Sequence, residues 1–165
     1  MGGEVTIRAA RDEEWDIVAS LTVDAYAEYA ASMAPDAWSM FAQGIANVRA
    51  RTSDGRQLVA ERDGAIVGAV TLFLDWRGAQ ADAAGVQLLA VPPHHRREGV
   101  GRALMEHCVA AARDAGKNRV VLTVSQEMEV ARDLTESMGF VRAAELDHEP
   151  APGVRLLGYA LRLHV

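Results

Sequence analysis

The sequence has almost no cysteine, and this limits the kinds of site that it can build. Its one cysteine, Cys108, has no partner for a disulfide within the chain and cannot form a multi-cysteine zinc site. We therefore expect a reducing compartment, the cytoplasm. His94 and His95 are neighbours whose rings cannot easily face one ion, and no third ligand is spaced nearby. The sequence thus predicts no metal site.

Positive charge and long apolar runs are also scarce. The chain has 17 Lys and Arg against 23 Asp and Glu, a formal net charge of -6, whereas a general nucleic-acid binder needs a basic face. No apolar run approaches the ~18 residues that cross a bilayer. The first residues do not follow the pattern of a secretory signal, so we expect the mature chain to start near Met1. We expect neither a nucleic-acid nor a membrane partner.

The sequence does have enough apolar residues for a core. Half of its 165 residues are hydrophobic, and a chain of this length buries roughly 70% of its surface on folding. No repeat, low-complexity tract or linker divides it, so we expect a single domain over residues 1–165.

Apolar periodicity predicts strands that alternate with helices. Helices are predicted over residues 15–26, 38–48, 99–115 and 129–138. Strands are predicted over residues 5–8, 58–61, 66–74, 86–91, 119–124, 140–145 and 154–163, with loops at 77–85 and 147–153. Asp63-Gly64 predicts a tight hairpin, and Pro35-Asp36 separates the first two helical segments.

The most informative segment runs from Leu89 to Leu104, through a basic turn into a helix. The N–H groups at a helix start lack partners, and Gly99 and Gly101 leave them open to a ligand, which predicts an anion site suited to a pyrophosphate. Positive side chains concentrate in the same turn, namely His94, His95, Arg96, Arg97 and Arg102. The alternative is that the glycines only relieve helix packing and the arginines are solvated.

Two other phosphate motifs do not match. A nucleoside-triphosphate loop needs Gly-Lys followed by Ser or Thr, but Gly101 is followed by Arg102-Ala103. A dinucleotide fingerprint needs a small residue where Leu104 stands and an acidic residue about 20 positions on. A nucleotide-binding oxidoreductase is therefore disfavoured.

The spacing Arg-x-x-Gly-x-Gly at Arg96, Gly99 and Gly101, preceded by Leu89 and Val91, resembles the GNAT family of N-acetyltransferases. The run from Ala131 to Phe140, with its Gly-Phe end, is similar to the family's helix before its sixth strand. The resemblance implies an α/β fold with a mixed, mostly antiparallel twisted sheet and helices on both faces. Strands 86–91 and 119–124 would be its parallel pair and would splay apart.

The resemblance also implies acetyl-CoA as cosubstrate. The main chain of Leu89, Ala90 and Val91 would pair with the pantetheine arm. A main-chain N–H near Val91 would face the acetyl carbonyl, where negative charge develops during attack. The loop from Arg96 would hold the pyrophosphate, through the N–H groups of Arg97, Glu98, Gly99, Val100, Gly101 and Arg102.

The sequence departs from the family at two positions near the chemistry. Thr135 stands where many members have a tyrosine that protonates the departing thiolate, and Met128 stands where many have an asparagine. A thiol with a pKa of about 8.5 leaves reasonably well as its anion, whereas acid catalysis typically contributes ~10²- to 10⁴-fold. We therefore expect activity without the tyrosine. A general base is not identified, and Asp75 is the candidate.

Aromatic residues are few, and several lie in the first two helical segments. The resemblance implies that these segments flank the acceptor groove. These residues are Tyr26, Tyr29, Trp38 and Phe41, with Trp76 beside a later loop. Ordinary core packing is the competing interpretation. Cys108 lies on the apolar stripe of its helix and is predicted to be a buried packing residue.

We therefore predict transfer of an acetyl group to a primary amine of a small molecule or peptide, by direct attack in a ternary complex. A noncatalytic domain that binds or senses acyl-CoA is the alternative, because Thr135 and Met128 replace the usual residues. The sequence leaves the acceptor and a homodimer open.

Overall fold

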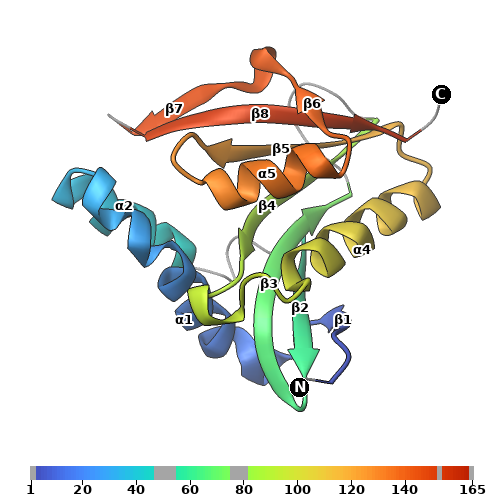
Figure 1. Cartoon of the computed structure of the whole chain (residues 1–165), viewed down its shortest axis with the longest axis horizontal. Helices are drawn as coiled ribbons and strands as arrows, with labels where there is room; N and C mark the ends of the chain where they lie inside the picture. The colour runs from blue at the N-terminus through green and yellow to red at the C-terminus, as the bar shows by residue number, and fades with distance from the viewer. Residues whose placement is uncertain (1–2, 47–54, 75–81, 152–153, 164–165) are drawn as a thin grey trace.

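The computed structural model describes residues 3–46, 55–74, 82–151 and 154–163. In these ranges an open sheet of eight strands has helices on both faces (Figure 1). The strands are β1 (Thr6–Ala9), β2 (Arg56–Arg62), β3 (Ala65–Phe73), β4 (Ala83–Ala90), β5 (Arg119–Ser125), β6 (Val141–Arg142), β7 (His148–Ala151) and β8 (Val154–Arg162). The α-helices are α1 (Trp15–Tyr26), α2 (Pro35–Ala46), α4 (Val100–Asp114) and α5 (Glu129–Ser137). Short 3-10 helices are η1 (Asp12–Glu14), η2 (Ala27–Ser32), η3 (Pro93–His95) and η4 (Ala144–Leu146).

The sheet is antiparallel except at its centre. Its order is β1-β2-β3-β4-β5-β8-β6, and β7 pairs with β8. The hairpin between β2 and β3 turns at Asp63 and Gly64, which both have positive φ, as the favoured two-residue turn requires. β4 and β5 form the parallel pair, so the predicted fold class is confirmed.

β4 and β5 pair only over their first halves. Their ladder ends at Val86, opposite Leu122. On its other side β4 pairs with β3, where the register shifts by one residue. Gln87 pairs with Thr71 and Ala90 pairs with Ala69, so β4 has one residue more than β3 between these two pairs. Leu88 sits in this bulge with a φ of 52°, and a bulge bends the strand that carries it. The second half of β4 therefore turns away from β5 (Figure 1).

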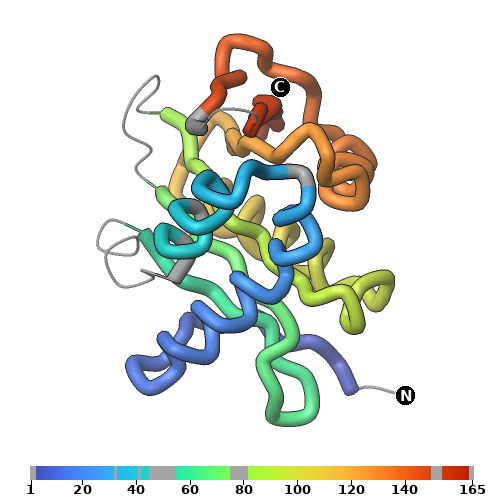
Figure 2. Tube along the Cα trace, turned by 90° about the vertical axis from the view of Figure 1, so that its left-hand side faces the viewer, coloured from blue at the N-terminus to red at the C-terminus, as the bar shows by residue number. Residues whose placement is uncertain are grey.

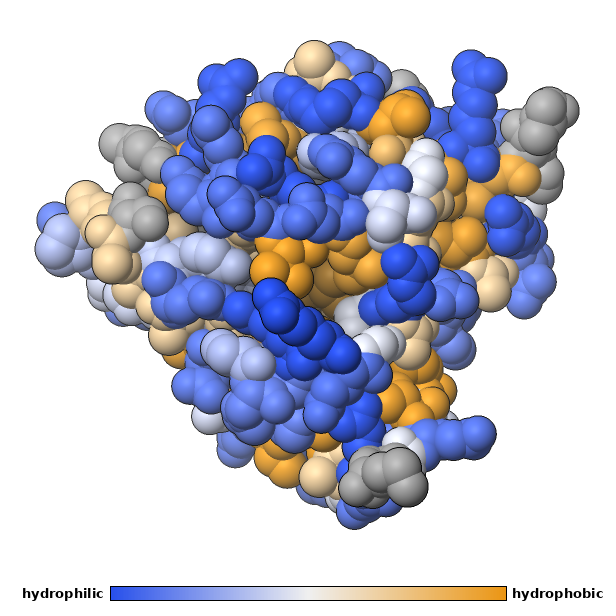
Figure 3. Space-filling model, in the orientation of Figure 1, coloured by the Kyte–Doolittle hydropathy of each residue, from blue (hydrophilic) through white to orange (hydrophobic). Residues whose placement is uncertain are grey.

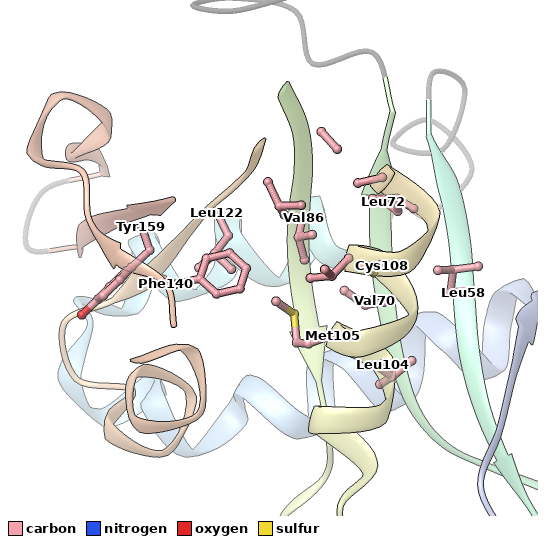
Figure 4. Close-up of a cluster of buried hydrophobic side chains, with 14 of the residues drawn as sticks. Leu58, Val70, Leu72, Val86, Leu104, Met105, Cys108, Leu122, Phe140 and Tyr159 are labelled. Carbon is pink, nitrogen blue, oxygen red and sulfur yellow. The ribbon is translucent and has the colours of Figure 1, made fainter. Parts of the chain in front are cut away.

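The two faces of the sheet are covered by different helices. The apolar stripe of α4, with Leu104, Met105 and Cys108, packs on one face (Figure 4). α1 packs on the other face, where Val18 lies with Val59 of β2, and Figure 2 shows α1 and α2 together on that side. Cys108 is 0% exposed, and burial raises the pKa of its thiol to about 12. It is a packing residue, as predicted.

Four predicted boundaries were wrong. α2 begins at Pro35 rather than after it, because proline is tolerated in the first turn of a helix. β4 begins at Ala83, inside the predicted loop, and β7 occupies residues 148–151 of another predicted loop. The strand predicted over 140–145 is reduced to Val141–Arg142 and is followed by η4. The first residues of β4 gain their strand structure from pairing with β5, and β7 gains its own from pairing with β8, which local sequence does not signal.

The helices in the described ranges are too short or too polar to cross a membrane. Within the same ranges, no three His, Cys, Asp or Glu side chains come together as a metal-binding group.

Candidate active site

A cleft opens where β4 leaves β5. It has a volume of about 630 Å³ and is lined by the second half of β4, by β5 and by α5. The end of α1 with η2 forms one end, and η4 with β8 forms another wall. Figure 3 shows apolar residues in a hollow between α5 and the segment that leads from β4 into α4. The cleft can therefore hold an extended ligand between the two strands.

The turn before α4 presents unpaired donors, and α4 itself lines the cleft further along, with Met105. Gly99 has a φ of 83° and α4 starts at Val100. The first helical hydrogen bond runs from the Ala103 N–H to the Gly99 carbonyl, at 3.0 Å. Within the described ranges, the N–H groups of residues 97–102 meet no acceptor. Since a helix start also carries partial positive charge, this turn is suited to an anion.

Gly101 keeps that turn open. A Cβ built at Gly101 would lie 3.2 Å from Cδ2 of Leu134 on α5 and 3.8 Å from Cγ2 of Val91. A side chain at this position would therefore fill the gap between the start of α4, α5 and the end of β4.

The basic residues of the turn do different things. Arg97 is exposed and meets no partner among the residues described. Arg102 donates from Nη2 to Oγ of Ser137 at 2.8 Å, which ties the start of α4 to the end of α5. Of the predicted cationic set, the guanidinium of Arg97 is therefore the most available to a ligand.

The side chain of Arg96 points toward the end of β4 and toward α1. Its Nε donates to the carbonyl of Val91 at 2.9 Å, and its Nη2 donates to the carbonyl of Ala25 at 3.1 Å. Its Nη1 pairs with the carboxylate of Glu28 in η2, and its main-chain N–H donates to Pro93 at 3.3 Å. Arg96 therefore joins the end of β4 to α1 and η2, and its contact with the anion stays a prediction.

Two of the predicted acceptor residues line the cleft. Tyr26 and Tyr29 lie in its wall, and burial together with the nearby Glu28 raises the pKa of Tyr29, so Tyr29 stays protonated at neutral pH. Trp38 packs against the cluster around Tyr26 instead, and it is not among the described residues that line the cleft. The side chain of Phe41, and Asp75 and Trp76, lie outside the described part of the chain.

Thr135 lies in the cleft wall contributed by α5. It is 2% exposed, and its hydroxyl donates to the carbonyl of Ala131 at 2.7 Å. A hydroxyl has one proton to donate, so that proton is already used. Met128, at the other departure from the family pattern, is buried in the same wall.

Sequence reasoning did not identify the side chains of η4 and β8 that line the cleft. Val154 and Leu156 lie two apart on β8 and both face the cleft, next to Leu146. Alternation along a strand could have indicated a shared face, but not that the face belongs to a cleft. Asp147 at this wall accepts hydrogen bonds from Arg142 at 2.8 Å and from the Gly158 N–H at 2.7 Å. These contacts hold the pKa of Asp147 well below its usual range, so it is a structural anion rather than a proton acceptor.

The structure thus combines an open sheet that has a splayed parallel pair with a helix start whose N–H groups are unpaired, an arrangement suited to an extended, anion-bearing ligand. The model of the acetyltransferase (GNAT) family matches residues 15–140. The chain belongs to this family.

Individual relatives agree with the family. The chain is 30% identical over 103 residues to L-amino acid N-acyltransferase MnaT of Escherichia coli, a match over 62% of this chain and 60% of that protein. It is 30% identical over 99 residues to the L-methionine sulfoximine/L-methionine sulfone acetyltransferase of Salmonella typhimurium, over 59% of this chain and 56% of that one. The matches thus span less than two thirds of these relatives. The structure of yncA from Salmonella typhimurium, solved with its cofactor acetyl-CoA, has the same fold, with a TM-score of 0.70, 21% identity and coverage of 98% and 95% of the two chains.

Proposed function

We propose that this protein transfers the acetyl group of acetyl-CoA to the primary amine of a small molecule, by direct attack in a ternary complex. The observation that carries the proposal is the cleft between β4 and β5, together with the unpaired N–H groups of residues 97–102 at the start of α4, the helix that lines the cleft with Met105. These two features match the two parts of acetyl-CoA, an extended pantetheine arm and a pyrophosphate.

The cofactor would lie along the free part of β4. The main-chain groups of Leu89 and Val91, on either side of Ala90, would pair with the pantetheine arm as an added strand would. The pyrophosphate would accept hydrogen bonds from residues 97–102, with Arg97 as the available cation. Arg96 would support this arrangement from behind by holding the Val91 carbonyl.

The chemical step needs few side chains. The neutral amine attacks the acetyl carbon, the new N–C bond forms, and the C–S bond breaks to release CoA as a thiolate. A main-chain N–H near Val91 would stabilise the oxyanion. The amine gives up one proton to water, and the thiolate gains one from water. Thr135 takes no part in this transfer, because its proton is donated to Ala131.

The acceptor would enter from the side of η2, η4 and β8. The wall there combines Tyr26 and Tyr29 with Leu146 and Leu156, which suits an amine with an apolar body. Two relatives are named for amino acids or their analogues, so L-amino acids and methionine sulfone form the first panel of acceptors. Peptide amines form the second.

The test measures release of the CoA thiol from acetyl-CoA in the presence of each amine, and product mass. Tyr29→Ala should raise the acceptor KM several-fold and leave acetyl-CoA binding unchanged. Glu149→Ala, an exposed position beside the same wall, is a matched control. If acetyl-CoA did not bind, or if both constants of Tyr29→Ala stayed at wild-type values, the corresponding part of the proposal would be wrong.

The second candidate is a noncatalytic domain that binds or senses acyl-CoA. Two observations favour it: the Thr135 hydroxyl already donates to the Ala131 carbonyl, and Met128 is buried. Tight binding of acetyl-CoA with no thiol release above the rate without enzyme, across both panels, would select this candidate.

A further inference from the structure

The turn before α4 contains a carboxylate at the place where a pyrophosphate would bind. Glu98 lies between Arg97 and Gly99, and its N–H belongs to the set that meets no acceptor in the described ranges. A negative side chain beside a bound anion opposes binding, because like charges repel at short range. Another group must therefore offset this charge.

Arg62, the last residue of β2, contacts this carboxylate. Its Nη1 lies 2.6 Å from Oε1 of Glu98. The Arg62 side chain is 12% exposed, whereas that of Glu98 is 43% exposed. The hydrogen bond from Arg62 lowers the pKa of Glu98, so Glu98 keeps its charge at neutral pH. Nδ1 of His95 lies 3.6 Å from the same oxygen.

The position of Arg62 is not the one that fold stability alone would favour. Its Nε is buried and has no hydrogen-bond partner in the described structure, and a buried donor without a partner lowers stability. An ion pair with a half-exposed carboxylate stabilises the fold too little to compensate for this unpaired donor. A role in ligand binding would account for keeping a guanidinium there.

We propose that Arg62 is a positioning residue for the cofactor: it holds the carboxylate of Glu98 away from the start of α4 and offsets its charge, so that the N–H groups of residues 97–102 can donate to a pyrophosphate. The inference rests on the proposed function, since it concerns how acetyl-CoA binds. It separates Arg62, which acts through Glu98, from Arg97, which would contact the phosphates itself.

A double-mutant cycle measured by calorimetric titration tests this. The ligands are acetyl-CoA and acetyl-pantetheine, which has the same arm without the pyrophosphate. Arg62→Ala should weaken binding of acetyl-CoA about tenfold at low salt, and Arg62→Lys should weaken it less. Glu98→Gln should restore the affinity of Arg62→Ala to within about twofold of wild type. The loss should shrink in about 0.5 M salt and should be absent with acetyl-pantetheine.

Arg56→Ala is the matched control, because Arg56 is an exposed arginine at the other end of β2, and thermal melting shows that each variant folds. Wild-type affinity in Arg62→Ala would overturn the inference. So would an Arg62→Ala/Glu98→Gln protein that stays as weak as Arg62→Ala, because Arg62 would then act on the ligand or the fold directly. A wild-type protein that binds neither ligand would contradict the proposed function itself.

Discussion

The hydroxyl of Tyr26 donates a hydrogen bond of 2.9 Å to the main-chain carbonyl of Leu89. A Cβ at Gly68 would lie 3.3 Å from the Ala90 carbonyl, so that carbonyl faces β3. Main-chain groups alternate in direction along a strand. Those of Leu89 and Val91 therefore point the other way, toward the edge of β4 that no longer pairs with β5. Tyr26 and Arg96 thus hold the two carbonyls of the edge proposed to bind pantetheine.

Tyr26→Phe should remove the hydrogen bond to the Leu89 carbonyl without leaving a cavity in the core. The variant keeps the ring and loses one hydrogen bond, so the free energy of unfolding should fall by about 1 kcal/mol. Binding of acetyl-CoA should weaken as the edge of β4 loses its fixed position. Urea unfolding and calorimetric titration measure the two effects, and a variant equal to wild type in both would show that this bond positions nothing.

Much of the fold was predictable because it depends on local pattern. Asp63-Gly64 supplies two residues that tolerate positive φ, and both have it. The apolar stripe of α4 and the apolar runs of β4 and β5 predicted correctly that these segments contribute to the buried core. The bulge at Leu88 was not predictable, since leucine has no preference for a φ of 52°. β7 depends on pairing with β8, which no local signal in its residues reveals.

The glycine turn before α4 was predictable for the same reason, because Gly99 and the helix start lie next to each other in the sequence. The role of Arg96 was not, because its partner Ala25 lies 71 residues away in the sequence. The pairing of Arg62 with Glu98, 36 residues apart, was equally hidden. Such contacts exist only once the sheet has brought distant segments together.

Gly101→Trp should prevent acetyl-CoA binding in a folded protein. The new side chain would fill the gap beside Leu134, and the neighbour at 3.2 Å is the flexible end of that leucine, so a small movement can accommodate the Cβ. Glu106→Trp, at an exposed position further along α4, controls for adding a tryptophan to the helix. Undiminished binding by calorimetry in a folded Gly101→Trp protein would contradict the assignment of the pyrophosphate to this turn.

Glu14 should make stability depend on acidic pH. Arg8 donates to both of its oxygens at 2.8 Å and the Arg11 N–H donates at 2.7 Å, which lower the pKa of Glu14 from 4.5 to about 2. Because the folded pKa is the lower one, this stabilisation is present above pH 4.5 and is lost as the pH falls toward 2. Glu14→Gln should therefore lower the free energy of unfolding by about 1 to 2 kcal/mol at neutral pH and by much less near pH 2.

Urea unfolding of wild type and Glu14→Gln across this pH range checks the prediction. Glu13→Gln, an exposed neighbour, should show little loss at any pH. An equal loss for Glu14→Gln at neutral and acidic pH would mean that shape, not charge, sets the contribution of Glu14.

Thr135 should be dispensable for the chemical step, although it stands at the position where many members of the family carry a tyrosine. Its proton is donated to Ala131, and it is 2% exposed. Thr135→Val keeps a β-branched side chain of similar size in α5 and removes only the hydroxyl. We expect kcat at saturating acetyl-CoA to fall less than tenfold, or about 1.4 kcal/mol, because a thiol with a pKa of about 8.5 can leave as its anion.

Thr135→Ser and Thr135→Tyr complete this series. Serine keeps the hydroxyl and should match wild type, whereas a tyrosine can direct its phenol into the cleft that Thr135 lines. A gain in kcat for Thr135→Tyr would show that the position can supply an acid that the wild-type protein lacks. A fall of about 10²-fold for Thr135→Val, the loss expected of general acid catalysis, with unchanged acetyl-CoA affinity would contradict the prediction. The hydroxyl would then have to leave Ala131 during catalysis and donate to the departing sulfur, directly or through water.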